Sequence, residues 1–163
     1  MSSRSQALTD AMDGPCGIAR SLRVLTDPWS VLLLREAVLG RRTYAQFRDA
    51  LGIATDVLSA RLANLVEHGV LERSPYREAG QRTRDQYTLT TAGHELKVVL
   101  VAMQQWGEEH MPVTQPPALI ARDPRSGTTV RVAAVNALGQ DVVPTEIELV
   151  VPAQGDAQPG PAT

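Results

Sequence analysis

The stretch TDVLSARLANLVEHG, residues 55–69, predicts a single helix with a start signal and a stop signal. Thr55 is a residue type that caps helices, because its hydroxyl can accept a hydrogen bond from a free amide of the first turn. Gly69 suits the left-handed backbone that ends many helices. Three leucines spaced by four and three residues form one apolar stripe: Leu58, Leu62 and Leu65. This helix can therefore bury one side and leave its small and polar residues free to enter a groove.

A second, shorter helix is predicted immediately before this one. Thr43 can cap residues 44–50, and Gly52 can end that helix. The two helices would then be joined by the three-residue turn Gly52-Ile53-Ala54. Two short helices joined by a short turn that contains glycine are typical of the helix-turn-helix motif. We therefore interpret residues 55–69 as the recognition helix of a DNA-binding motif.

A β-hairpin is predicted directly after the recognition helix. Residues 70–73 and 86–89 have strand-like patterns, and the residues between them are rich in charge and in turn formers. A hairpin at this place is the wing of a winged helix. Thr90 can then cap a long helix over residues 92–110, whose apolar positions cover more surface than one small domain usually needs.

Two helices are predicted ahead of the motif, over residues 16–25 and 29–39. The dipeptide Asp27-Pro28 indicates the start of the second, because aspartate caps a helix and proline tolerates its first position. That helix is apolar over most of its circumference and is expected to lie at the centre of the core. Residues 1–15 are rich in serine and show no helical stripe of useful length, so we expect a mobile N-terminal arm.

The chain changes character after the long helix. Prolines mark the boundary, and short β-like runs over residues 118–121, 129–135 and 145–151 predict a small antiparallel β appendage within residues 112–151. Residues 152–163 are rich in Pro, Gly, Ala and Gln and are expected to be disordered. The predicted fold class is α+β and mainly α, with a winged helix-turn-helix domain over residues 16–111 followed by the appendage.

Composition narrows the possible functions. The formal net charge of −2 means that any nucleic-acid surface must come from local clustering of basic residues. Cys16 is the single cysteine, so one chain can form neither an internal disulfide nor a thiolate zinc cluster. No apolar run approaches the roughly 20 residues of a membrane span, and the polar N-terminus lacks a signal-peptide core. We expect a cytoplasmic protein that has no membrane partner.

The order of elements and several motifs resemble the HxlR family of bacterial transcription regulators, which is related to the MarR-type winged helices. The matching segments are residues 16–20, 27–36, 47–51, 57–62, 65–73 and 87–93, with Trp106-Gly107 in the last helix. The resemblance implies a homodimeric DNA-binding repressor or activator without enzymatic activity, in which the first and last helices build the dimer. Some relatives carry a C-terminal extension with cysteine pairs that resembles a zinc ribbon. The comparable stretch here has neither Cys nor His, so we expect no metal and no cofactor.

Double-stranded DNA carrying an inverted repeat is the expected partner, with half-sites about 34 Å apart. Phosphate contacts are expected from arginines, with the alternative that the charged hairpin is merely a solvated surface. Arg61 flanks the leucine stripe and could equally lock the helix through a salt bridge. The phosphate set is Arg41, Arg42, Arg48, Arg61 and the wing residues Arg77, Arg82 and Arg84. The base-reading set is Thr55, Asp56, Ser59, Ala60, Ala63 and Asn64.

Two triggers for a change in DNA binding are considered. Cys16 precedes a helix, as many reactive thiols do, and the resemblance implies that it senses oxidants or electrophiles. The alternative is a small residue that packs at the helix start. A small apolar effector could instead bind between core and dimer helices, although such a stripe is more often plain core and interface. The residues of this dimer or effector surface are Trp29, Leu96, Val99, Met103, Trp106, His110 and Met111.

A different class of function also fits the near-neutral charge. Winged helices can bind proteins, so a protein-interaction module without specific DNA binding is the alternative to a regulator. Strong salt dependence of duplex binding would separate the two.

Overall fold

The computed structural model describes residues 3–77 and 82–151 and divides into two compact units, Met1–Ala118 and Leu119–Thr163. The predicted disordered tail, residues 152–163, lies outside the described residues. Unit 1 contains α1 (Ser3–Asp13), α2 (Gly17–Leu25), α3 (Pro28–Val38), α4 (Tyr44–Leu51), α5 (Thr55–Glu67), β1 (Leu71–Tyr76), β2 (Arg84–Leu89) and α6 (Thr91–His110). Unit 2 contains β3 (Ala134–Val135), β4 (Asp141–Val142) and the 3-10 turn η1 (Pro144–Glu146). The predicted α+β, mainly α winged helix is confirmed.

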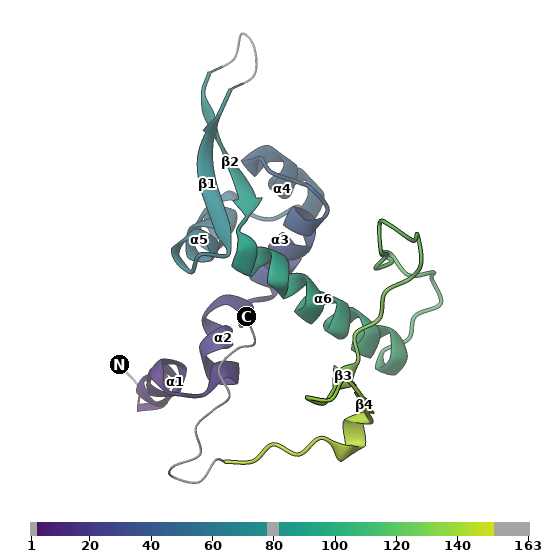
Figure 1. Ribbon diagram of the computed structural model, residues 1–163. Helices are drawn as coiled ribbons and strands as arrows, with labels where there is room; N and C mark the ends of the chain where they lie inside the picture. The colour runs from purple at the N-terminus through teal and green to yellow at the C-terminus, as the bar shows by residue number, and fades with distance from the viewer. Residues whose placement is uncertain (1–2, 78–81, 152–163) are drawn as a thin grey trace. The chain divides into compact units, whose positions relative to one another are not determined.

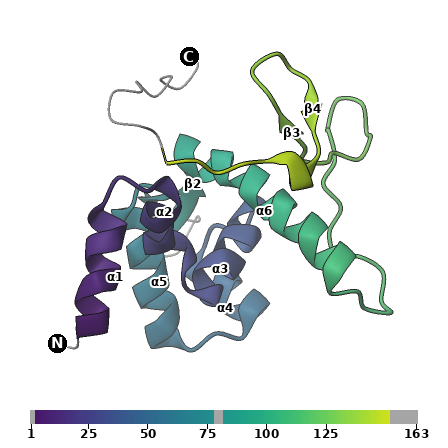
Figure 2. The same ribbon diagram turned by 90° about the horizontal axis from the view of Figure 1, so that it is seen from below.

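Helix α3 lies at the centre of unit 1, where it contacts α2, α4, α5, α6 and β2 (Figures 1 and 2). Its Leu33 and Leu34 are fully buried, together with Phe47 of α4. The predicted leucine stripe of α5 completes this core, since Leu58, Leu62 and Leu65 are at most 1% exposed. The burial of these leucines presses α5 against α3 and α4, and it turns the opposite side of α5 outward.

Strands β1 and β2 form an antiparallel hairpin that extends past α4 and α5 (Figure 1). Leu71 pairs with Leu89 at the base of the hairpin, and Tyr76 pairs with Arg84 farther out. The strands are longer than the sequence pattern predicts, so the ordered hairpin reaches farther from the body. The amide of Tyr87 also donates to the carbonyl of Arg42 at 2.7 Å, which fastens β2 to the segment before α4.

The helix starts confirm two sequence signals and correct a third. The Asp27 carboxylate accepts from the amide of Trp29 at 2.9 Å, and Thr43 forms a capping box with Gln46. Thr55 is not the cap of α5, because Ala54 holds that position without a side-chain hydrogen bond and Thr55 is already helical. After the short turn that follows Gly52, the helix begins at Thr55, one residue earlier than a cap at Thr55 would place it. The Thr55 hydroxyl therefore lies outside the capping position.

The N-terminal segment corrects a second expectation. Residues 1–15 lack an apolar stripe, yet Ser3–Asp13 forms α1, which packs against α2. Good helix formers such as Ala, Leu, Met and Gln can support a helix through backbone propensity alone. A hydrogen bond from the Gln6 amide to the Asp10 carboxylate, one turn apart, adds to this. The mobility expected for this arm stays a prediction.

Unit 2 confirms the antiparallel pairing but not the extent of the predicted strands. Ala134 pairs with Val142, whereas the predicted strand over residues 145–151 begins in η1 and then makes no ladder. Two turns are closed by side chains: Asp123 accepts from the amide of Arg125, and Asn136 accepts from the amide of Leu138, both at 2.9 Å. The Ser126 hydroxyl, and then the Arg125 amide, lower the pKa of Asp123. Polar turns therefore organise this unit more than strand pairing does.

Among the described residues, no helix combines the length and the apolar character needed to cross a membrane.

Glycine 93 marks the closest approach between α6 and the hairpin base. A Cβ built on Gly93 would lie 2.2 Å from the carbonyl oxygen of Val70, whereas a Cβ on Gly107 of the same helix meets nothing within 4 Å. Gly93→Ala should therefore lower the free energy of unfolding by about 1–3 kcal/mol or more. Gly107→Ala should raise it by roughly 0.5–1 kcal/mol, because alanine favours a helix interior. Urea unfolding followed by circular dichroism measures both, and equal effects would contradict the packing at Gly93.

Candidate nucleic-acid interface

The outer side of α5 is an exposed surface of small and polar residues. Its three leucines are buried, and the positions opposite them lie open to solvent. The structure thus brings most of the predicted base-reading residues together on one helix face: Thr55, Asp56, Ser59, Ala60 and Ala63 are exposed. We name these five residues the α5 outer face. The N-terminal part of a recognition helix is the part that contacts base edges, and four of the five lie in the first half of α5.

Asn64 differs from the other predicted base readers because it is half-buried and lies near the end of α5. Nδ1 of His68 lies 3.0 Å from the carbonyl oxygen of Asn64. Because a carbonyl oxygen only accepts hydrogen bonds, this contact is a hydrogen bond when Nδ1 carries the proton. The Asn64 side-chain nitrogen lies 3.5 Å from the same Nδ1. Asn64 is also roughly 13 Å along the helix axis from Thr55.

A hydroxyl that sequence reasoning missed joins the α5 outer face to α4. The Tyr44 hydroxyl donates to the carbonyl of Thr55 at 2.7 Å and lies 3.1 Å from the hydroxyl of Ser59. The Ser59 hydroxyl lies 2.8 Å from the same carbonyl oxygen. No local pattern predicts this contact, because Tyr44 belongs to a different helix and reads as an ordinary aromatic residue.

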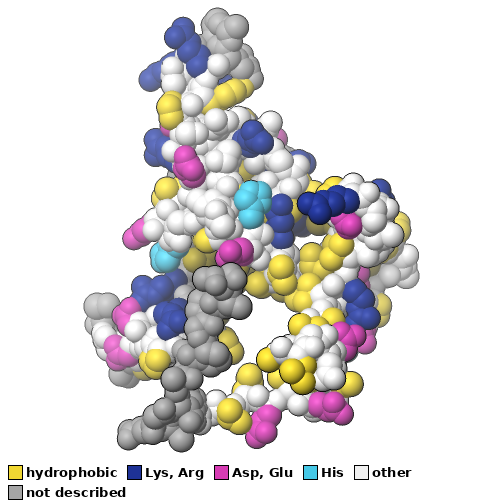
Figure 3. Space-filling model, in the orientation of Figure 1, with side chains coloured by type: hydrophobic (Ala, Val, Ile, Leu, Met, Phe, Trp, Pro, Cys, Tyr) yellow, Lys and Arg dark blue, Asp and Glu magenta, His cyan; other side chains and the backbone are white. Residues whose placement is uncertain are grey.

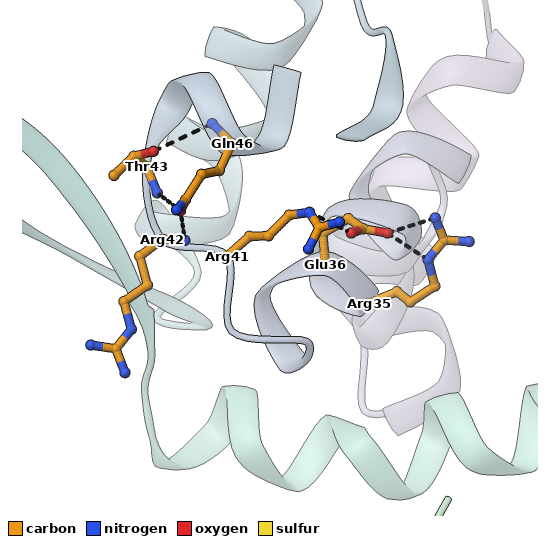
Figure 4. A network of polar contacts seen from close by, with 6 residues as sticks. All are labelled: Arg35, Glu36, Arg41, Arg42, Thr43 and Gln46. Atoms are coloured by element: carbon orange, nitrogen blue, oxygen red, sulfur yellow. Dashed lines mark hydrogen bonds and ion pairs between the residues drawn. The ribbon is translucent and has the colours of Figure 1, made fainter. Parts of the chain in front are cut away.

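Two of the predicted phosphate-binding arginines are held by carboxylates inside unit 1. Arg41 Nε lies 3.0 Å from Glu36, a buried carboxylate that also binds Arg35 at 2.7 Å (Figure 4). Arg61 pairs with Asp27 at 2.8 Å, so the same aspartate caps α3 and holds α5. Of the two roles considered for Arg61, the structure shows the salt bridge. These arginines stabilise the framework that positions the α5 outer face.

The other predicted arginines point away from the core. Arg42 makes no ion pair with another described residue, and its guanidinium extends away from the Glu36 cluster (Figure 4). Arg48 pairs with its neighbour Asp49 at 2.8 Å, where both side chains are exposed. An exposed pair of this kind is weak, so Arg48 can exchange its partner for a phosphate.

The hairpin carries the remaining basic residues. Arg77, Arg82 and Arg84 are exposed, and Figure 3 shows Lys and Arg side chains near the free end of β1 and β2. Closer to the base, Arg73 pairs with Asp85 at 2.6 Å, and this hydrogen bond raises the pKa of Arg73. The hairpin root is rigid, since Tyr87 is buried against Phe47 in an edge-on contact, and burial raises the pKa of Tyr87. A basic arm is thus fixed beside the recognition helix.

The predicted dimer or effector residues lie on α3 and on or just after α6, and they differ in burial. Trp29 and Leu96 pack against the core, while Val99, Met103 and Trp106 are 39%, 49% and 59% exposed. His110 is exposed and its ring lies against Trp106, with ring centroids 5.1 Å apart. Exposed Met111 follows α6. Within unit 1, therefore, Val99, Met103, Trp106 and His110 form surface and enclose no cavity by themselves.

A surface hollow of about 440 Å³ lies elsewhere, between the end of α3 and α4. Its lining residues are Leu39, Gly40, Arg41, Gln46, Asp49 and Ala50.

Cys16 is exposed and stands at the N-cap of α2 without a side-chain cap hydrogen bond. The Arg20 guanidinium donates to the carbonyl of Pro15 at 2.8 Å, so it fixes the backbone next to the cysteine. The alternative of a buried packing residue does not hold in this chain. The exposed thiol is accessible to reagents from solvent.

The paired helices, the buried leucine stripe and the basic hairpin define a winged helix-turn-helix protein. Residues 24–115 match the family model described as HxlR-like helix-turn-helix. The match covers more than half of the sequence, and the chain belongs to this family.

Relatives and solved structures agree with this assignment. The HTH-type transcriptional regulator Rv3095 of Mycobacterium tuberculosis is 38% identical over 105 residues, or 64% of this chain and 65% of that protein. The match thus spans just under two thirds of the length of this relative. The crystal structure of PA1607, described as a candidate transcription factor, has a TM-score of 0.75 and 32% identity, and covers 86% of this chain and 98% of its own. The redox regulator HypR in its oxidized form has a TM-score of 0.52 and 25% identity, with 58% and 97% covered.

The names of the relatives describe regulators rather than enzymes. They support the expectation that this chain has no catalytic activity.

Proposed function

We propose that the chain is a homodimeric transcriptional regulator that binds an inverted repeat in double-stranded DNA and acts as a repressor. The observation that carries this proposal is the α5 outer face, which is exposed to solvent and stands beside a basic hairpin. Base contacts come from α5 and phosphate contacts from Arg42, Arg48 and the wing arginines. A dimer bound across two half-sites would keep other proteins from the same DNA, which is the simplest form of repression.

A second copy of the chain is the proposed occupant of the apolar surface on α2 and α6. Ile18 and Leu22 of α2 are 67% and 37% exposed, and Met103 and Trp106 of α6 share their apolar character. Within α6 only Gly93 is buried, and Met103 and Trp106 in the C-terminal half of this helix are 49% and 59% exposed. A helix of 20 residues spans about 30 Å, enough to carry an interface.

Cys16 is the proposed sensor, with a small apolar effector on the α6 surface as the other trigger. The cysteine is exposed at the start of α2, whose Ile18 and Leu22 belong to the proposed dimer surface. A disulfide between two protomers, or an electrophile bound to the thiol, would displace α2 and change the spacing of the recognition helices. The likeness to HypR, a redox regulator, supports this role.

DNA binding is tested by fluorescence anisotropy on the intergenic DNA next to the gene and on random duplex, each across a range of salt concentrations. Arg82→Ala should weaken binding to both duplexes alike and reduce the slope of log K against log salt by about 0.9. Ser59→Ala and Asn64→Ala should instead change the preference between duplexes. Equal losses on both duplexes for every variant would contradict the base-reading role of α5. Binding that does not depend on salt would favour a protein-interaction module.

The dimer is tested by sedimentation equilibrium. Met103→Glu should shift the protein toward monomer, because it would bury an unpaired carboxylate in the interface. Lys97→Glu serves as the control, since this exposed residue of α6 lies on a different side of the helix. A wild-type protein that stays monomeric at micromolar concentration would contradict the proposed dimer.

The sensor is tested by adding diamide to the protein in the same anisotropy assay. The wild type should lose operator binding, and a reductant should restore it, while Cys16→Ser should bind DNA with or without diamide. If Cys16→Ser and the wild type respond alike, redox sensing at Cys16 is wrong and the effector remains as the trigger.

A further inference from the structure

Three oxygen atoms form a triangle where α4 meets the start of α5. The hydroxyls of Tyr44 and Ser59 lie 2.7 and 2.8 Å from the carbonyl oxygen of Thr55 and 3.1 Å from each other. All three distances are within hydrogen-bond range. Ser59 belongs to the α5 outer face, so this triangle stands at the surface that is proposed to face the DNA bases.

Counting protons shows what the triangle can offer to a base. Each hydroxyl carries one proton, and the carbonyl oxygen carries none. The Tyr44 proton can go to Thr55 or to Ser59, and the Ser59 proton can go to Thr55 or to Tyr44. In each arrangement that uses these contacts, both protons stay inside the triangle. The hydroxyl oxygens then present only lone pairs to the outside.

We propose that Tyr44 and Ser59 together form an acceptor-only reading unit. On the strand that it contacts, this unit selects a base whose exocyclic amino group lies in the major groove, N6 of adenine or N4 of cytosine, over guanine or thymine. A serine alone can read donors or acceptors, since its hydroxyl is free to rotate. Here Tyr44 removes that choice, and it acts as a specificity-determining residue although it lies on the helix before the recognition helix. The inference rests on the proposed DNA-binding function.

The charges around the triangle point to the same preference. Asp56, three residues before Ser59, is exposed and its carboxylate also only accepts hydrogen bonds. Arg61 is the one basic residue of α5, and it is held by Asp27 at 2.8 Å. Arginine bound to guanine O6 and N7 is the commonest specific contact to DNA. Helix α5 has no free arginine for that contact, so its first half is suited to amino groups and not to guanine.

The test is a selection of binding sites from a randomised duplex pool with the wild type, Tyr44→Phe and Ser59→Ala. The wild type should enrich a motif that Ser59→Ala relaxes at one base pair, and the adenine or cytosine of that pair marks the strand that the unit contacts. The loss of preference should be about three- to tenfold, as for one or two hydrogen bonds. Tyr44→Phe should relax the same position and admit guanine or thymine on the contacted strand, because Ser59 regains the freedom to donate.

A base analogue then tests whether the exocyclic amino group is the group that the protein recognises. In the selected duplex, purine in place of adenine, or 2-pyrimidinone in place of cytosine, removes only the amino group at that position. The wild type should lose affinity by the same factor, and Ser59→Ala should lose none. Ser21→Ala is the matched control. The exposed Ser21 hydroxyl donates to the carbonyl of Ile18 in its own helix at 2.8 Å, as the Ser59 hydroxyl does to Thr55, but Ser21 lies on α2 and outside the reading unit. It should leave the motif unchanged.

The outcomes separate this inference from the function on which it rests. A selective wild type whose motif Tyr44→Phe and Ser59→Ala do not alter, or whose affinity does not fall when the amino group is removed from the adenine or cytosine at the altered position, overturns the reading unit alone. A wild type that enriches no sequence overturns the regulator and the reading unit together. The Tm of each variant is expected to lie within a few degrees of the wild-type Tm. Such a result would show that the phenylalanine ring of Tyr44→Phe packs as the tyrosine ring does.

Discussion

The burial of three leucines on one side of α5 is the constraint on which the rest of unit 1 depends. Leu58, Leu62 and Leu65 meet the leucines of α3 and Phe47 of α4 in the core. Each buried leucine contributes about 1.5–3 kcal/mol relative to an exposed one. Because all three share one helix face, their burial also decides which residues face outward. The same interaction therefore stabilises the fold and presents the α5 outer face.

The charged residues divide between the framework and the surface. Glu36 binds Arg35 and Arg41 at the end of α3, and Asp27 binds Arg61 across to α5. The Asp27–Arg61 pair joins the start of α3 to α5, and both groups of pairs use arginines that could otherwise meet phosphate. The basic contribution to DNA binding then falls to Arg42, Arg48 and the hairpin. Such a limited set agrees with a chain whose net charge is −2.

Local patterns predicted the parts of the structure that local physics determines. The leucine stripe, the turn at Gly52, the left-handed Gly69 and the capping by Asp27 follow from periodicity and backbone conformation. The cap at Thr55 was wrong because turn geometry shifted the helix start by one residue. Helix α1 and strand β4 were not predicted, because neither has a clear apolar period, whereas β3 lies within the predicted run 129–135. The partners of Arg61 and Tyr44 lie on other helices, so only the packed structure reveals which arginine is held and which hydroxyl reaches Ser59.

The central claim is that the α5 outer face and the hairpin contact DNA while the apolar surface of α6 does not. Chemical-shift mapping of the ¹⁵N-labelled protein, titrated with its enriched duplex, tests this most directly. The account predicts that the largest shifts fall on residues 55–63 and on the strands β1 and β2, with the amides around Met103 and Trp106 unchanged. Shifts that gather on α6 and leave α5 unchanged would contradict it, and would show that the buried leucine stripe does not present a DNA-reading surface.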